Sequence, residues 1–569
     1  MFNSKKKQLF ESGSKTKTSE NAFINHGLKK SAETRSGNDA PKYSTTGNPF
    51  VDQFGSLGSY KAPREYIEIE RDCITLYAKD PLLSIMFILY LRLITRVVTF
   101  FDGKKTETTQ KGAGLRYESI MRMMWLYLNH EDLFWRNIKL FITVGSWKDI
   151  ITMLQIDVMY HGWDDKVISW RKISDIILAG LENPNTTNLV KKYLPQIKAN
   201  SKCHTVESQA DNVVAKYLCS RLFEDRRLKS EKYYADYRKL KASGKAHVWQ
   251  QLISQGRFLE INFDTIHGRA LAQLVSSKFL KNNGLESKYE AWIAKKPVAK
   301  FTGYVYELAQ KIDSRSLKKY QIDTINAQYR QLLEHAKGTQ SDIIVVKDTS
   351  GSMDSTAIGT NMSSYHVAKS LSIYFGNLLQ GVFANHYIDF SSNAILRAII
   401  GNNFYEAWVS EHRTHSANTN FLSVAELFAN TKNTEVPESD FPKGILCISD
   451  GEFDNPRNNG LAGKMFETTN IVAFKNILLN HGFSKEFVDN FKFIFWDIRN
   501  TFYNYKDEVK FESYNLEKNV FYFSGFDGSV ISFLLQEEVK AEKPKAQPKD
   551  AYEVFLAAMN QEVLRLVEI

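Results

Sequence analysis

Asp348, Ser350 and Ser352 form the pattern D-x-S-x-S directly after the apolar run 343–346. One carboxylate and two hydroxyls from a single tight loop could fill part of the oxygen shell that a hard divalent cation requires. Gly351 allows the backbone to turn sharply between the two serines. The pattern alone is also compatible with a turn held by Asp and Ser side-chain hydrogen bonds.

Two later segments could complete such a metal site. Thr419, in N-T-N-F at 418–421, offers a hydroxyl just before a helical pattern, where a threonine could also cap the helix. Asp450, in S-D-G at 449–451, offers a carboxylate after another apolar run, and we expect it to act through water. The sequence therefore predicts a Mg²⁺ or Mn²⁺ site formed by Asp348, Ser350, Ser352, Thr419 and Asp450. With only two carboxylates the metal stays electron-poor, so its open position favours an acidic group of a partner.

Motifs of common enzyme classes are missing from the sequence. It contains no G-x-x-x-x-G-K-[ST] loop, no G-x-S-x-G turn and no H-E-x-x-H. Ser350 and Ser352 have no recognisable base, since His366 and His415 are near only in sequence and lone histidines are more often structural. We therefore predict that the protein is not an enzyme.

Short apolar runs alternate with helical patterns between residues 341 and 536. Strands are predicted at 343–346, 386–390, 394–400, 445–448, 491–496 and 520–523, with helices at about 364–380, 421–430, 462–481 and 529–535. The second and third strands could form a hairpin. This alternation predicts a doubly wound, Rossmann-like α/β domain, whose ligands lie at the carboxyl ends of the strands.

Residues 61–335 show apolar positions at helical spacing, interrupted by glycines and by few prolines. Without a strict repeat period, the pattern predicts a degenerate α-helical, HEAT-like array. Its most apolar stretch, 81–93, contains Arg92 and is shorter than the ~20 residues that span a bilayer, so we expect a buried helix.

The two ends of the chain have a different composition. Residues 1–60 carry nine Lys or Arg and five Asp or Glu among scattered apolar residues, which predicts a basic disordered tail. Residues 537–550 predict a charged linker. Residues 551–569 predict one amphipathic helix of about five turns, which either docks on its own protein or binds a partner.

Charge and cysteine content indicate which partners and which cellular compartment to expect for the protein. The formal net charge of +10 favours nucleic acid or another acidic partner, although solubility alone accounts for it as well. The four cysteines lack C-x-x-C spacing, so free buried thiols are expected and a zinc site is the weaker alternative. Without a signal peptide, the chain is expected to be soluble and cytoplasmic, without a membrane partner.

The motifs DTSGSM (348–353), NTNF (418–421) and SDGEFD (449–454) resemble those of von Willebrand factor A domains. The segments 115–128, 145–150, 233–240, 267–283 and 326–333 resemble the helical region of Ro autoantigen (TROVE) proteins. The combination is closest to an uncharacterised viral and eukaryotic family that joins both parts, which keeps a virus or phage origin open. The resemblance covers about 65–535. The family's glycine-rich basic turn has a looser counterpart here at 103–116.

The TROVE resemblance implies a ribonucleoprotein component that binds structured or single-stranded RNA on its helical part. Lys and Arg side chains would contact phosphates, and Tyr233, Tyr234 and Tyr237 could stack on bases or pack in a core. The candidate RNA contacts are Lys104, Lys105, Lys111, Arg116, Arg226, Arg227, Lys229, Lys232, Arg238, Lys239 and Lys241. The alternative hypothesis is a metal-dependent protein-interaction scaffold, in which the metal binds an acidic residue of a protein partner.

Overall fold

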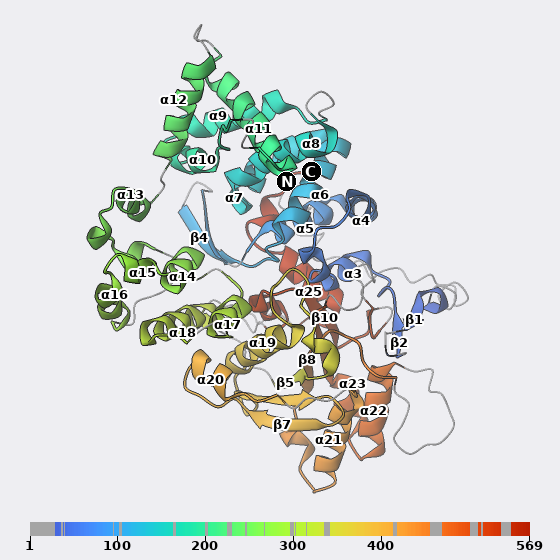
Figure 1. Ribbon diagram of the computed structural model, residues 1–569. Helices are drawn as coiled ribbons and strands as arrows, with labels where there is room; N and C mark the ends of the chain where they lie inside the picture. The colour runs from blue at the N-terminus through green and yellow to red at the C-terminus, as the bar shows by residue number, and fades with distance from the viewer. Residues whose placement is uncertain are drawn as a thin grey trace.

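The computed structural model describes most of the 569-residue chain. The described residues are 29–35, 38, 40–94, 96–101, 105–162, 167–199, 203–224, 230–244, 247–266, 268–295, 301, 303–313, 316–334, 342–413, 418–455, 469–500, 510–513, 516–535 and 548–569. A helical part occupies the first half of the chain, and a mixed sheet with helices occupies the second (Figure 1). The protein is therefore an α plus α/β molecule, as the sequence predicted.

The α/β part is built on a six-stranded sheet with the order β10-β9-β8-β5-β6-β7. The strands are β5 (Ile343–Asp348), β6 (His386–Phe390), β7 (Ala394–Ala398), β8 (Gly444–Ser449), β9 (Lys492–Asp497) and β10 (Val520–Ser524). All neighbours are parallel except β6 and β7, which form the predicted antiparallel hairpin. All six strands lie where the apolar runs predicted them, to within two residues at either end.

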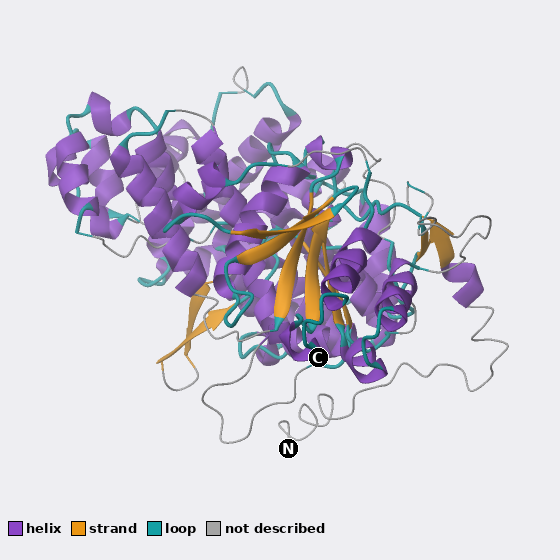
Figure 2. Ribbon diagram, turned by 90° about the horizontal axis from the view of Figure 1, so that it is seen from below, coloured by secondary structure: helices purple, strands orange, loops and turns teal. Residues whose placement is uncertain are grey.

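Helices cover both faces of this sheet, as Figure 2 shows from below. Alternate strand residues enter two different cores, because successive side chains point to opposite faces. Val345 and Leu446 join the core that contains α19 (Ser364–Leu378), whereas Val346 and Cys447 join the other. That second core contains α21 (Leu422–Lys432), α22 (Asn470–Asn480) and α23 (Lys485–Asn490). The short helix α20 (Phe404–Ser410) was not predicted.

The helical part forms an arc that begins and ends against the α/β part (Figure 1). Its first half contains α4 (Tyr66–Lys79), α5 (Pro81–Arg92), α6 (Arg116–Asn129), α7 (Glu131–Val144), α8 (Trp147–His161), α9 (Trp170–Glu182), α10 (Thr187–Tyr193), α11 (Val206–Leu222) and α12 (Ser230–Ser243). The second contains α13 (Val248–Ser254), α14 (Gly268–Ser276), α15 (Phe279–Asn282), α16 (Glu286–Ile293), α17 (Val305–Asp313) and α18 (Lys319–Glu334). As predicted, α5 is buried, with every residue from Leu82 to Leu91 inside the core.

The hairpin of β3 (Arg96–Phe101) and β4 (Lys105–Gln110) interrupts the helical part. The sequence predicted helices throughout 61–335, so this antiparallel pair corrects that expectation. Both strands contain β-branched residues, Val97, Val98 and Thr99 in β3 and three threonines in β4. Such residues favour strands, and this was the signal that the helical interpretation overlooked.

The prediction of a disordered tail over 1–60 is wrong for its second half. Pro49 begins helix α3 (Pro49–Gly55), and the Asn48 side chain caps the helix by accepting from the Phe50 N–H. Phe50 and Phe54, one helical turn apart, are buried in the main core. Two short strands, β1 (Glu33–Arg35) and β2 (Pro41–Tyr43), precede the helix. The strand β2 also bridges to Phe511 of the α/β part.

The C-terminal segment docks on its own protein, but as a shorter helix than predicted. Helix α25 (Ala551–Met559) ends after nine residues, and a 3₁₀ turn (Leu564–Leu566) follows. The Phe555 ring stacks on Phe50 with ring centroids 5.1 Å apart. The first and last described parts of the chain therefore pack against each other. No helix among the described residues is long and apolar enough to cross a membrane.

Candidate metal centre

The predicted metal ligands lie in loops at the carboxyl ends of neighbouring strands. Asp348 is the last residue of β5, and Asp450 directly follows β8, which pairs with β5 in parallel. Thr419 lies three residues before α21. Because parallel strands end at the same sheet edge, the loops of Asp348 and Asp450 converge there. The Thr419 loop reaches the same edge, since the Asn420 N–H donates at 2.8 Å to the carbonyl of Ser391, which directly follows β6. Asp348, Ser350, Thr419 and Asp450 are buried, and Ser352 is partly exposed.

Asp348 organises the first loop. Its Oδ1 accepts a hydrogen bond from the backbone N–H of Ser350 at 2.8 Å, and its Oδ2 accepts from the Ser449 hydroxyl at 2.5 Å. The Ser350 and Ser352 hydroxyl oxygens lie 3.1 Å apart. The D-x-S-x-S loop thus brings one carboxylate and two hydroxyls together, and Ser449 of β8 ties this loop to the neighbouring strand.

Asp450 lies against the same group from the β8 side. Its Oδ2 accepts a hydrogen bond from the Asn500 amide at 2.6 Å, and the Ser352 hydroxyl also bonds to its carboxylate. The Asn500 amide further donates to the Ser352 carbonyl at 3.0 Å. Asn500 therefore links the two loops that carry Ser352 and Asp450.

Thr419 is connected to the Asp450 loop through Asp454. The Thr419 N–H donates to Asp454 Oδ2 at 3.0 Å, and the Asp454 N–H donates back to the Thr419 carbonyl at 3.0 Å. Asp454, the last residue of the SDGEFD motif, thus positions Thr419.

Burial makes the two carboxylates hard to ionise in the absence of a cation. Removal from water raises the pKa of Asp348, although the hydroxyls of Ser449 and Ser350 oppose this. Burial, and then the charge of Asp348, raises the pKa of Asp450 to about 8. A divalent cation would offset both effects, because it stabilises the ionised forms. Two carboxylates and three hydroxyls also form the hard oxygen donor set that Mg²⁺ and Mn²⁺ prefer.

The side chain of Arg413 supports the first loop from outside. Its guanidinium donates to the Ser350 carbonyl at 2.6 Å and to the Thr349 carbonyl, forms an ion pair with Asp354, and lies 4.2 Å from the Tyr365 ring centroid. Arg413 and Asn500 were missed by sequence reasoning, because both lie far along the chain from the loops they hold. Within the described residues, no group of three or more His, Cys, Asp or Glu side chains could hold a metal, so the hydroxyls are essential to the candidate site.

The four cysteines are free and buried, as expected. This agrees with the prediction of structural thiols, and the alternative of a zinc site gains no support among the described residues.

Those candidate RNA contacts whose side chains the structure describes do not form one surface. Lys104, Arg226, Arg227 and Lys229 lie outside the described residues, as does the Lys105 side chain. Lys111 is buried, with its ammonium 5.4 Å from the Phe533 ring centroid. Arg116 forms an ion pair with Asp149 at 2.6 Å, and the Lys241 ammonium donates to the Leu194 carbonyl. The candidates with exposed, described side chains are Lys232, Arg238 and Lys239, all on α12.

The three tyrosines of α12 have different surroundings. Tyr237 is buried and its hydroxyl donates to the Pro195 carbonyl at 3.1 Å, so it is a core residue. Tyr233 stacks on Phe223 with centroids 5.6 Å apart. Tyr233 and Tyr234 are both partly buried against the main core. The core alternative is therefore confirmed for Tyr237.

Comparison with known proteins gives one family match and a weak structural likeness. Residues 342–563 match a family described as Domain of unknown function (DUF7788). No curated protein matches the chain. The chain is similar to the crystal structure of the Deinococcus radiodurans RO (RSR) protein, with 12% identity, a TM-score of 0.30, and coverage of 82% of this chain and 90% of that chain. The family match extends through α25, which the sequence analysis had treated as separate from the α/β domain.

Proposed function

We propose that this protein is a non-enzymatic binding protein that holds Mg²⁺ or Mn²⁺ at Asp348, Ser350, Ser352, Thr419 and Asp450. The observation that carries the proposal is the pair of buried carboxylates beside three buried or partly buried hydroxyl residues, all at one sheet edge. Asp348 would bind directly, and Asp450 through water. The resemblance of these motifs to von Willebrand factor A domains supports the same assignment. Catalysis is not expected, because neither serine has a recognisable base.

The proposed cation supplies a binding point for an acidic group of a protein partner. Two carboxylates only neutralise a divalent cation, and Asp450 acts through water, so the metal stays electron-poor and a further carboxylate would be a favourable ligand. The chain's own contribution is to position the hydroxyls and carboxylates. Ser449 and Asn500 hold the two aspartates, and Arg413 holds the intervening backbone.

Calorimetric titration of the full chain with MgCl₂ and with MnCl₂ tests this proposal. We expect Asp348→Ala to abolish binding while circular dichroism shows a folded protein. Asp440→Ala, which removes an exposed carboxylate elsewhere in the α/β part, is the matched control and should bind as the wild type does. Unchanged binding in Asp348→Ala would overturn the site assignment.

We also propose RNA binding by the helical part as a second candidate function. The specific observation is the exposed basic face of α12, where Lys232 and Lys239 are two turns apart and Arg238 is adjacent. The resemblance of the helical segments to TROVE proteins supports the same partner. Phosphate contacts there would make affinity fall with salt, with a slope of about 0.7–0.9 per contact.

A salt series of binding to a structured RNA pool tests the second proposal. Reversal of Lys232, Arg238 and Lys239 to Glu should weaken binding and flatten its salt dependence. The control is reversal of three exposed lysines of the α/β part, Lys443, Lys485 and Lys518, which should have little effect. Equal losses in the two variants would show that overall charge, and not the α12 face, determines binding.

A further inference from the structure

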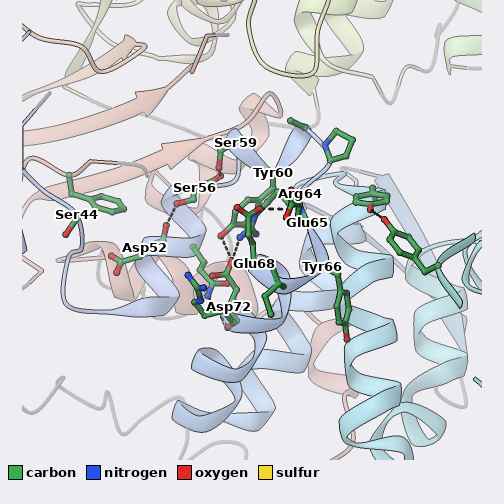
Figure 3. A pocket seen from close by; sticks show the side chains of 18 residues that line it. Ser44, Asp52, Ser56, Ser59, Tyr60, Arg64, Glu65, Tyr66, Glu68 and Asp72 are labelled. Atoms are coloured by element: carbon green, nitrogen blue, oxygen red, sulfur yellow. Dashed lines mark hydrogen bonds and ion pairs between the residues drawn. The ribbon is translucent and has the colours of Figure 1, made fainter. Parts of the chain in front are cut away.

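A cavity of about 800 Å³ lies where the N-terminal segment meets the helical part (Figure 3). Its walls come from residues 44–72, from α6 and α8, and from Phe511 of the α/β part. None of the proposed metal ligands lines it. This volume is typical of sites that bind small organic molecules, and the convergence of several chain segments is typical of ligand pockets.

The lining of the cavity includes a guanidinium group, that of Arg64. This group forms ion pairs with Asp72 and Glu118, both at 2.9 Å, and lies 4.5 Å from the Tyr60 ring centroid. Tyr60, Arg64, Glu68 and Asp72 gather together in Figure 3. Since Arg64 is paired on two sides, it is poorly placed to bind an anion. Its contacts show how carboxylates and an aromatic ring together hold a guanidinium group at this wall of the cavity.

The lining is acidic although the chain as a whole is basic. Four carboxylates line the cavity, those of Asp52, Glu65, Glu68 and Asp72, against the guanidinium groups of Arg64 and Arg71. The formal charge of the whole chain is +10. The four carboxylates outnumber the two guanidinium groups. Because a cleft with an excess of one sign of charge attracts ligands of the opposite sign, this cavity favours cations over phosphate.

Glu68 is the carboxylate best placed to meet an incoming ligand. Its side chain is 45% exposed, and Arg64 approaches it only to 4.0 Å. By contrast, Asp52 is partly buried and accepts hydrogen bonds from Thr45 and Thr46. Asp72 is occupied by Arg64 and Arg122, and the Glu65 carboxylate caps the N-terminus of α4 by accepting from the Glu68 N–H. The hydrogen bond that Glu68 accepts from the Glu65 N–H is long, at 3.3 Å, so the Glu68 carboxylate remains available to a ligand.

Aromatic side chains form the wall on the α6 and α8 side. The Tyr117 and Tyr160 hydroxyls lie 3.2 Å apart, and Tyr160 is 57% exposed. Tyr66 of α4 also lines the cavity. Tyrosine faces attract ammonium and guanidinium groups through cation–π interactions. Together with Glu68, they offer both an ion pair and an aromatic surface to one ligand.

We propose that this cavity binds an organic cation, an amine or guanidinium group carried on an apolar body, with Glu68 as its ion-pair partner and Tyr117 and Tyr160 as its aromatic wall. The site is independent of the proposed metal centre. The cationic group could belong to a free small molecule or to a Lys or Arg side chain of a protein, and the recognition chemistry is the same in both cases.

Calorimetric titration of the full chain with agmatine, spermidine and an arginine-containing peptide tests the proposal, with AMP as the anionic comparison. We expect at least one cationic probe to bind and AMP not to bind. Glu68→Gln should weaken binding about fivefold, the loss expected for an ion pair with a half-exposed carboxylate. Glutamine can still accept from the Glu65 N–H, so the helix cap remains. Tyr160→Leu should weaken binding to a similar extent.

The control variant is Glu182→Gln, which removes one exposed carboxylate of α9 outside the cavity and should bind as the wild type does. Binding of agmatine or spermidine identifies a free amine as the ligand class, and binding of the peptide alone identifies a protein side chain; both support the proposal. The absence of binding by every cationic probe at millimolar concentration would overturn it. Equal affinities of the wild type and Glu68→Gln, or preferential binding of AMP, would overturn it too.

Discussion

At the scale of single residues, Asp450 controls how the proposed metal centre responds to pH. Burial and the charge of Asp348 raise the pKa of Asp450 to about 8. At neutral pH the cation-free protein therefore carries a proton on this carboxyl group. A cation binds the ionised form, so its binding must release that proton. The folded protein also holds the proton more tightly than the unfolded chain, for which the pKa is 3.8.

The first prediction concerns the pH dependence of metal affinity. Since one proton is released, Mg²⁺ affinity should rise about tenfold per pH unit from pH 6 to 8 and level off above the pKa of Asp450. The stability of the cation-free protein should change in the opposite direction. Its free energy of unfolding should fall as pH rises from 4 to 8, because the folded state binds more protons than the unfolded state. Calorimetry and urea denaturation measure the two trends.

Asp450→Asn provides the control for this prediction. Asparagine does not titrate, so the variant should bind Mg²⁺ more weakly and with little dependence on pH. The same wild-type affinity at pH 6 and pH 8 would contradict the assignment of the proton to Asp450.

The candidate ligands could be predicted from sequence because they occur in short motifs next to strand-like runs. Asp348, Ser350 and Ser352 fall within five residues, and Asp450 directly follows β8. The residues that hold them could not be predicted in this way. Asn500 lies 50 residues from Asp450, and Arg413 lies 63 residues from Ser350. Only the packing of the loops brings such distant residues together, and no local pattern encodes it.

At the scale of elements, strand β2 packs against the Asp450 loop and supports it. The Lys42 ammonium of β2 donates to the Gly451 carbonyl, forms an ion pair with Glu512 at 3.3 Å, and lies 4.8 Å from the Phe453 ring centroid. Asn38, just before β2, donates to the Glu452 carbonyl at 2.6 Å. Lys42 and Glu512 are both buried. The N-terminal segment is thus part of the support of the candidate metal centre.

The second prediction is that Lys42→Met destabilises the protein by about 3 kcal/mol, because it leaves the Glu512 carboxylate buried without its partner. Urea denaturation measures this change in the free energy of unfolding. The double variant Lys42→Met with Glu512→Gln removes the unpaired charge and should recover much of the loss. Lys30→Met, at an exposed position ahead of β1, is the control and should have little effect.

If Lys42→Met lowered the free energy of unfolding by less than about 0.5 kcal/mol, the Lys42–Glu512 pair would contribute no more than a surface ion pair does. That result would contradict its role in supporting the Asp450 loop.

Element positions were easier to predict in the α/β part than in the N-terminal segment. Buried parallel strands appear as continuous apolar runs, which is why β5, β8 and β9 were located correctly. In the sequence, the residues that flank α3 are mostly polar, so its two core phenylalanines, Phe50 and Phe54, gave no recognisable pattern. This seven-residue helix is too short to show a helical period, and it depends on tertiary packing for its stability.

At the scale of the whole molecule, one hydrophobic core extends from the first half of the helical part into one face of the α/β sheet. Phe87 of α5, Phe521 of β10 and Phe555 of α25 belong to the same cluster of buried side chains. The predicted boundaries at 335–341 and 537–551 therefore separate segments of the sequence, but not independent cores. Because this core spans the boundary, we expect the elements that form it, α5, β10 and α25 among them, to unfold together.

Lys61 connects the N-terminal segment to both parts. Its ammonium lies 4.2 Å from the ring centroids of Tyr304 and Phe526 and 5.0 Å from that of Tyr306. It also donates to the Tyr306 hydroxyl at 3.0 Å. Tyr306 belongs to α17 of the helical part, and Phe526 follows β10 of the α/β part. Burial in this aromatic cage lowers the pKa of Lys61 to about 8.

The last prediction tests the packing of Lys61 between the helical and α/β parts through the pH dependence of the free energy of unfolding. The folded state favours neutral Lys61, whereas the unfolded chain keeps it protonated up to its ordinary pKa of 10.5. Between pH 8 and 10.5 the unfolded state therefore binds more protons, so stability contributed by Lys61 rises with pH in this window. Lys61→Met fills the cage without a titrating group. The wild-type free energy of unfolding, minus that of Lys61→Met, should increase by on the order of 1–3 kcal/mol from pH 8 to 10. Other lysines titrate equally in both proteins and cancel in this difference, which urea denaturation at pH 7, 8, 9 and 10 measures. A difference independent of pH would mean that Lys61 titrates as an exposed lysine does and that the cage is open in solution.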